Sequence, residues 1–78
     1  MNKLIPQAPA FAWRVYIKAV GYQYYTFYRI PYVPLQGDSF RLVKRDAITE
    51  NSEVGIYTRA QYENRVSNVI GRTDCEVL

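Results

Sequence analysis

The chain contains no histidine, a single cysteine and no long apolar segment, and each absence removes a class of function. Without imidazole, the chain lacks the usual general base and the commonest metal ligand. Cys75 cannot close a disulfide within the chain or form a cysteine zinc site. No segment reaches the roughly 18 apolar residues that a membrane helix requires, so we expect no membrane partner. The lone cysteine and the absence of a secretory leader predict a reducing, cytoplasmic setting.

The remaining reactive groups give little support for catalysis. The glycines stand apart, so there is no phosphate-binding loop. Cys75 has no histidine to activate it, and an incidental role is favoured over a catalytic one. Asp46, Glu50 and Glu53 are the best carboxylate candidates for magnesium binding or acid–base work, although acidic side chains around a loop are usually only solvated. We expect no enzyme, no cofactor and no metal site, with carboxylate chemistry as a minor alternative.

Charge is modest in total but uneven along the chain. Ten lysines and arginines stand against seven aspartates and glutamates, which gives a formal net charge of +3. Residues 1–45 hold seven of the basic side chains and one acidic one, whereas residues 46–78 hold three basic and six acidic. Two interpretations stay open: separate basic and acidic surfaces, or an ordinary surface whose charges add unevenly along the chain.

The clearest structural signal is a strict alternation of side chains over residues 11–20, which is typical of a half-buried strand. Gly21 permits a tight turn, and residues 22–30 are rich in aromatic and β-branched residues, so the two runs predict an antiparallel hairpin. Pro31 and Pro34 are expected to end the second strand. The residues predicted to face the core from the first strand are Phe11, Trp13, Val15 and Ile17.

The second half of the chain predicts two more strands, over residues 39–45 and 53–57, with Val54 and Ile56 facing the core. Thr58 and Gln61 fit a capping box at the start of a helix. Gly71 is typical of the left-handed residue that follows a helix end. The expected apolar stripe of this helix is Tyr62, Val66, Val69 and Ile70.

A last edge strand is expected within residues 73–78, so the element order is β-β-β-β-α-β. This order predicts a single α+β domain over residues 11–78, a small antiparallel sheet or partly open barrel with one helix packed on it. Residues 1–10, with Pro6 and Pro9, predict an extended N-terminal arm. An exposed edge strand at residues 74–78 also leaves a homodimer open.

Eight tyrosines are the main positive signal, and six of them lie between Tyr16 and Tyr32. Tyrosine and arginine are enriched at protein-binding hot spots, so we expect a non-catalytic protein that binds and modulates or inhibits a larger protein or nucleoprotein machine. The alternative for any single tyrosine is half-buried packing within a small sheet. The expected partner-binding residues are Arg14, Tyr16, Lys18, Tyr24, Tyr28 and Arg29.

Direct binding of DNA or RNA is the second hypothesis, because aromatic rings stack on bases while basic side chains follow phosphates. Its expected phosphate contacts are Arg41, Lys44 and Arg45. The segments 37–45 and 54–59, a Gly-Asp strand and a Gly-Tyr strand before a helix, resemble HIRAN-type DNA-binding domains. The resemblance implies a small barrel that binds DNA, but the Asn and Asp signature between the two strands of that family is missing here.

Overall fold

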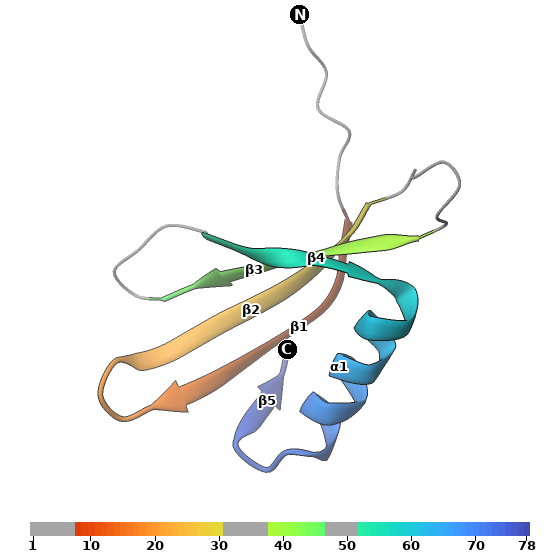
Figure 1. Ribbon diagram of the computed structural model, residues 1–78. Helices are drawn as coiled ribbons and strands as arrows, with labels where there is room; N and C mark the ends of the chain where they lie inside the picture. Colours follow the sequence, from red (N-terminus) through yellow and green to blue (C-terminus); the bar gives the residue numbers. More distant parts are fainter. Residues whose placement is uncertain (1–7, 31–37, 47–51) are drawn as a thin grey trace, which may run out of the picture.

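The computed structural model describes residues 8–30, 38–46 and 52–78, and within them the chain forms five strands and one helix. All strands pair antiparallel in one open sheet of order β4-β3-β2-β1-β5, and the helix packs on one face of it (Figure 1). The predicted α+β class and the element order are confirmed. The elements are β1 (Ala8–Ile17), β2 (Gly21–Ile30), β3 (Ser39–Arg45), β4 (Ser52–Thr58), α1 (Arg59–Gly71) and β5 (Cys75–Val77).

The hairpin of β1 and β2 is confirmed, but its turn lies earlier than the alternation predicts. The Val20 amide donates to the Ile17 carbonyl at 3.0 Å, and Gly21 has a φ of 86°. This is the three-residue turn followed by a left-handed glycine that matches the twist of a hairpin. Lys18 therefore belongs to the turn and not to the strand. At the other end β1 begins at Ala8, so residues 8–10 of the predicted arm are strand, and residues 1–7 lie outside the described residues.

Phe27 forms the centre of the core and is fully buried. Its ring lies 5.7 Å from Trp13, and the rings of Tyr57 and Tyr62 meet it edge-on at 5.6 and 4.9 Å. Tyr62 also stacks on Phe40 with ring centroids 3.8 Å apart. Edge-on and stacked aromatic pairs add about 0.5–1.5 kcal/mol each beyond the area they bury. Aromatic contacts between α1 and the sheet thus compensate for the small size of the core.

The expectation that Val54 and Ile56 face the core is wrong, because their side chains are 48% and 53% exposed. The β3–β4 register skips Val54 at a bulge and then places Ile56 opposite Arg41, on the face away from the helix. Tyr57 points to the core instead and packs against Phe27. The larger ring fills the space beneath α1, which decides the register of this strand.

The predicted capping box of α1 is confirmed. The Thr58 hydroxyl accepts from the Gln61 amide at 3.3 Å, and the Gln61 side chain accepts from the Thr58 amide at 3.0 Å. Each of these bonds satisfies a backbone group that the first turn of a helix leaves without a partner. The helix then leads from one edge strand, β4, to the other, β5 (Figure 1). It is too short and too polar to cross a membrane, and no other helix is found in the described ranges.

The end of α1 differs from the sequence prediction. Val69 is buried as expected and Tyr62 and Val66 are half-buried, but Ile70 is 64% exposed, so its place in the apolar stripe is wrong. Gly71 is the last helical residue and not a left-handed cap, because the chain leaves through an extended Arg72 whose amide still donates to Val69. Because the chain is extended directly after the helix, the short connection to β5 is sufficient for β5 to pair with β1.

Candidate functional site

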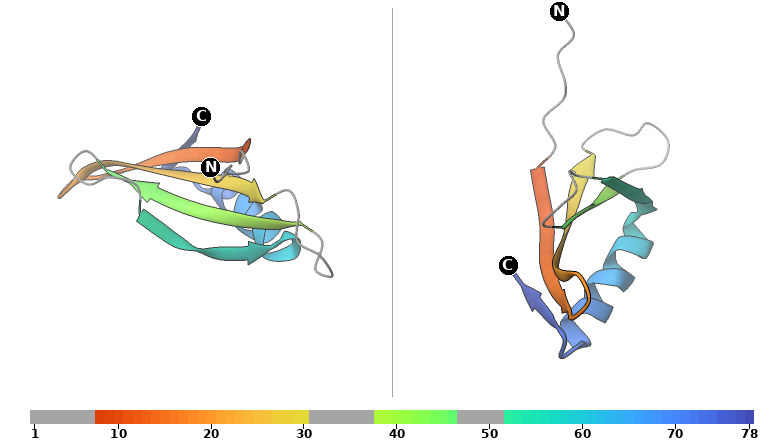
Figure 2. Two further views of the ribbon diagram at one scale, coloured as in Figure 1. Left: turned by 90° about the horizontal axis from the view of Figure 1, so that it is seen from above. Right: turned by 90° about the vertical axis from the view of Figure 1, so that its left-hand side faces the viewer.

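The register of the sheet decides which hairpin face is covered by α1. Trp13, Tyr25, Phe27, Phe40 and Leu42 face the helix. No described helix covers the other face, as the two views in Figure 2 show. We call this second surface the helix-free face. It is made up of Ala12, Arg14, Tyr16, Tyr22, Tyr24, Thr26, Tyr28, Arg41, Val43, Arg45, Glu53, Ile56, Glu76 and Leu78.

Two arginines flank Tyr24 in a row that runs across four strands. In register from β5 to β3 the row is Glu76, Arg14, Tyr24 and Arg45. Arg14 Nε donates to Glu76 Oε1 at 2.8 Å, and its guanidinium lies 4.2 Å from the centroid of the Tyr22 ring. The Arg45 guanidinium lies 5.3 Å from the Tyr24 ring centroid. Glu76 first, and then Tyr24, raise the pKa of Arg14 above its usual value, so this arginine stays charged.

The next row toward the other end of the strands consists of small side chains, which leaves a hollow in the face. Ala12, Thr26 and Val43 stand in register there, and Val43 is only 4% exposed although no described helix covers it. Larger side chains on both sides make the walls. We call this depression of about 290 Å³ the Thr26 hollow. Its lining residues are Tyr24, Thr26, Tyr28, Val43, Arg45 and Leu78.

Apolar side chains and a second ion pair complete the helix-free face. Tyr16, Ile56 and Leu78 are 59%, 53% and 63% exposed, a large apolar area for so small a domain. Arg41 pairs with Glu53 at 3.2 Å near the β4 edge, as Arg14 pairs with Glu76 near the β5 edge. The face therefore combines aromatic, aliphatic and charged groups, and a carboxylate accompanies an arginine at each edge.

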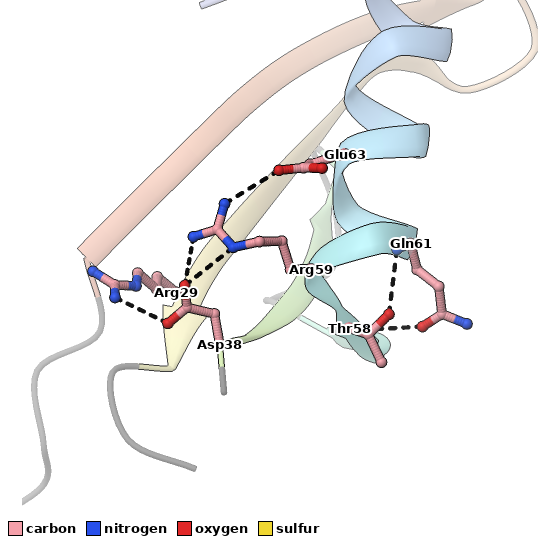
Figure 3. A network of polar contacts seen from close by, with 6 residues as sticks. All are labelled: Arg29, Asp38, Thr58, Arg59, Gln61 and Glu63. Atoms are coloured by element: carbon pink, nitrogen blue, oxygen red, sulfur yellow. Dashed lines mark hydrogen bonds and ion pairs between the residues drawn. The ribbon is translucent and has the colours of Figure 1, made fainter. Parts of the chain in front are cut away.

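Arg29 lies on the opposite side of the sheet, in a network of charged groups around Asp38 (Figure 3). The Arg29 guanidinium donates to Asp38 Oδ1 at 2.9 Å, and Arg59 Nε donates to Asp38 Oδ2 at 3.2 Å. Arg59 also pairs with Glu63 at 3.3 Å, within the first turns of α1. Arg59 first, and then Arg29, hold the pKa of Asp38 below its usual value. This network connects β2, the start of β3 and the helix.

The structure brings together most, but not all, of the residues expected to bind a partner. Arg29 lies on the other face of the sheet and pairs with Asp38, so the expectation that it shares a surface with the others is wrong. Lys18 lies in the hairpin turn, outside the strand that carries Arg14 and Tyr16. Lys44 of the alternative set lies opposite Tyr25 and points to the helix side. The residues of both sets that do meet on the helix-free face are Arg14, Tyr16, Tyr24, Tyr28, Arg41 and Arg45.

Three exposed and largely apolar side chains of this face, Tyr22, Ile56 and Leu78, were not assigned to it from the sequence, for different reasons. Tyr22 stands opposite Tyr16, and extending the alternation of Tyr24 and Tyr28 by one step would have found it. Ile56 was assigned to the core because the bulge in β4 is not visible in the sequence. Leu78 reaches the face only because its amide pairs with the Ala12 carbonyl at 3.0 Å, a contact between distant parts of the chain.

The groups considered for catalysis are not assembled into a site by the described residues. Glu53 pairs with Arg41, whereas Glu50 lies outside the described ranges. Burial raises the pKa of the Cys75 thiol, which favours the unreactive protonated form. Within residues 8–30, 38–46 and 52–78, no three metal-ligating side chains come together.

Comparisons with protein-family models, with curated proteins and with solved structures found no match to this chain. The resemblance to HIRAN-type domains is therefore not supported by a family match, and the open sheet differs from the barrel that it implies. The site has to be interpreted from its own chemistry.

Proposed function

We propose that this protein is a non-catalytic binding domain whose helix-free face docks onto a larger protein or nucleoprotein complex and modulates it. The observation that carries the proposal is the joint exposure of tyrosines, arginines and aliphatic side chains on one sheet face. Tyrosine and arginine are the residue types most enriched at hot spots, and here Arg14 and Arg45 are each held against a tyrosine ring. Side chains that are already ordered lose less entropy when a partner binds.

The Thr26 hollow supports a protein partner in particular. Hot spots of protein interfaces are side chains that insert into well-packed pockets, and a hollow of about 290 Å³ is large enough for one such side chain. The accessible lining of the hollow is mostly polar, because Tyr24, Tyr28 and Arg45 stand around a floor of Thr26 and the nearly buried Val43. A partner side chain that brings hydrogen-bonding groups to Tyr24, Tyr28 and Arg45 suits this lining best.

Direct nucleic-acid binding is the second candidate, because the row of Arg14, Tyr24 and Arg45 alternates charge and ring as single-strand platforms do. The charges of the face favour it less. Arg14 and Arg41 are already paired with Glu76 and Glu53, and those carboxylates repel phosphate. Nucleic-acid surfaces are normally far more basic than this one.

A photo-crosslinking experiment tests both candidates. Benzoylphenylalanine placed at Tyr16 or Tyr22, both exposed on the helix-free face, is expected to capture the same partner in the protein's native cells. The matched control is Asn64, exposed on the helix, which should not capture it. Once the partner is identified, the double variant Tyr16→Ala/Arg45→Ala should weaken its binding at least tenfold, since two hot-spot truncations cost more than about 1 kcal/mol each.

The unfolding midpoint of the double variant must stay close to that of the natural chain, because the loss of affinity can then be attributed to lost contacts with the partner and not to unfolding. Equal capture from Asn64 and Tyr16, or unchanged affinity of the double variant, would contradict the proposal. Loss of all capture after nuclease treatment, together with binding of a labelled oligonucleotide at low salt, would instead select the nucleic-acid function.

A further inference from the structure

A second cavity lies on the other side of the sheet, between α1 and the outer half of the β1–β2 hairpin. Its volume is about 530 Å³, within the range of small-molecule sites. Val15, Trp13 and Tyr25 line it from the sheet, and Val69 and Asn68 line it from the helix. The Thr26 hollow belongs to the opposite face, so the two sites share no lining residue.

The cavity follows from how α1 is connected. The helix packs chiefly against β3, β4 and β5, and it reaches the hairpin mainly through large rings such as Phe27 and Tyr62. Those rings fill the space near the start of α1. Toward its end the helix offers only Val69 as a buried side chain, and the hairpin beyond Trp13 is left partly uncovered.

One wall of the cavity is aromatic. The rings of Trp13 and Tyr25 are stacked, with centroids 5.1 Å apart and planes inclined by 7°. Val15 and Val69 add aliphatic surface on either side. An aromatic ring of a ligand suits such a wall, because aromatic pairs favour edge-to-face and offset-stacked contacts.

The rim of the cavity carries positive charge. The Arg65 guanidinium lies 4.6 Å from the centroid of the Tyr57 ring, and no carboxylate pairs with it among the parts of the chain that the structure describes. Arg72, the other basic lining residue, is neutralised by Asp74, whose carboxylate accepts from its Nε at 2.8 Å. Arg65 is therefore the cation that is available to a ligand.

We propose that this cavity binds a planar aromatic anion, a carboxylate or sulfonate, with its rings against Trp13 and Tyr25 and its anionic group at Arg65. The guanidinium fork matches the oxygens of either acid group, and the aromatic wall takes up the remainder of the molecule. The site lies on the opposite face of the sheet from the partner surface proposed above. Of the residues of that surface only Tyr16 also lines the cavity, and the variants below leave Tyr16 intact.

Two fluorescent probes with the same ring system separate the two parts of the proposal. Anilinonaphthalene sulfonate carries the anionic group, and N-phenyl-1-naphthylamine lacks it. We expect saturable one-to-one binding of the sulfonate to the folded natural chain, with amide NMR shifts at Val15, Tyr25 and Asn68. Arg65→Gln should weaken the sulfonate roughly tenfold, as for loss of a charge-assisted hydrogen bond, and change the neutral probe less than about twofold.

Two further variants make the result specific. Asn68→Trp, at an exposed helix position on the rim, should fill the cavity and abolish binding of both probes while the NMR spectrum shows an intact fold. Arg45→Gln, an arginine of the helix-free face, should leave both probes unaffected. Equal weakening of the two probes by Arg65→Gln, NMR shifts confined to the helix-free face, or no saturable binding would each overturn the proposal. Capture of the protein partner should be unchanged in Arg65→Gln, so the two proposals fail separately.

Discussion

Asp38 is the residue on which three parts of the fold depend. It accepts from Arg29 of β2 and Arg59 of α1 while standing directly before β3, so its carboxylate holds the helix start against the sheet (Figure 3). Neither arginine is predictable as its partner, because the contacts join residues 9 and 21 positions apart. A sequence shows that charges are present, but only the fold shows which of them meet.

The Asp38 network predicts a pH-dependent stability. Arg59 and Arg29 lower the folded-state pKa of Asp38 below the unfolded value of about 3.9. The ion pairs therefore stabilise the fold fully above that value, and the stabilisation is lost as the pH falls through the lower folded pKa. Urea unfolding between about pH 7 and pH 2 should show a falling midpoint.

Asp38→Asn is the control for this effect. It should lower the midpoint at neutral pH and flatten its pH dependence in the acid range. The unfolding midpoint of Asp38→Asn will still fall slightly with falling pH, because Arg72 also lowers the pKa of Asp74. An identical pH profile for Asp38→Asn and the natural chain would show that the network is not stabilising.

At the scale of elements, the hairpin turn depends on the backbone of one glycine. Gly21 adopts a φ of 86°, and a Cβ built there meets no atom within 4 Å. The cost of Gly21→Ala is therefore backbone strain alone, about 1–2 kcal/mol of folding free energy. Gly71→Ala is the matched control, since Gly71 is helical with equally open space and alanine should stabilise the fold by up to about 1 kcal/mol there.

Urea unfolding of the two variants should show a lower free energy of unfolding for Gly21→Ala and an unchanged or higher one for Gly71→Ala. Destabilisation by Gly71→Ala comparable to that by Gly21→Ala would mean that the helix ends in the left-handed glycine that the sequence predicts, and not in the extended Arg72 seen here.

Local patterns predicted most elements, because local physics determines them. The strand over residues 39–45 and the Thr58 capping box are found as predicted, since alternation and capping involve neighbours only. The errors arise where distant contacts decide: the bulge beside Val54 sets the face of Ile56, and the pairing of β5 with β1 determines how α1 ends. Likewise the alternation of side chains predicted that Arg14, Tyr16, Tyr24 and Tyr28 lie on one face. The hollow on that face could not be predicted, because it depends on the register of three strands.

At the scale of the molecule, the uneven charge of the sequence is largely balanced by folding. Arg14 and Arg41 from the basic half pair with Glu76 and Glu53 from the acidic half. Among residues 8–30, 38–46 and 52–78, these pairs mix basic and acidic side chains of the two halves on one face, which favours the second interpretation of the uneven charge. Exposed pairs of this kind contribute about 0–1 kcal/mol each, so stability rests on the aromatic core.

Because the core is small, truncating a single core side chain should lower the free energy of unfolding strongly. Phe27 is fully buried among Trp13, Tyr57 and Tyr62, and Phe27→Ala should cost about 3–5 kcal/mol. A chain of this length has a total stability of only about 4–12 kcal/mol, so much of that margin disappears. Circular dichroism and urea unfolding should show a strongly lowered midpoint, whereas Phe27→Leu should stay near the natural value. Equal midpoints for the two variants would show that the core lies elsewhere.

The pairing of β5 with β1 has a consequence for the order of folding. Arg14 and Glu76 are 62 positions apart, and only three residue pairs hold the two strands in register. Closing this long loop costs more chain entropy than closing the short turn between β1 and β2, and few contacts offset that cost. We therefore expect β5 to pair with β1 last during folding and to separate from it first during local unfolding. During folding, the hairpin tyrosines are therefore displayed before β5 pairs with β1. The edge of the helix-free face that includes Glu76 and Leu78 is completed last.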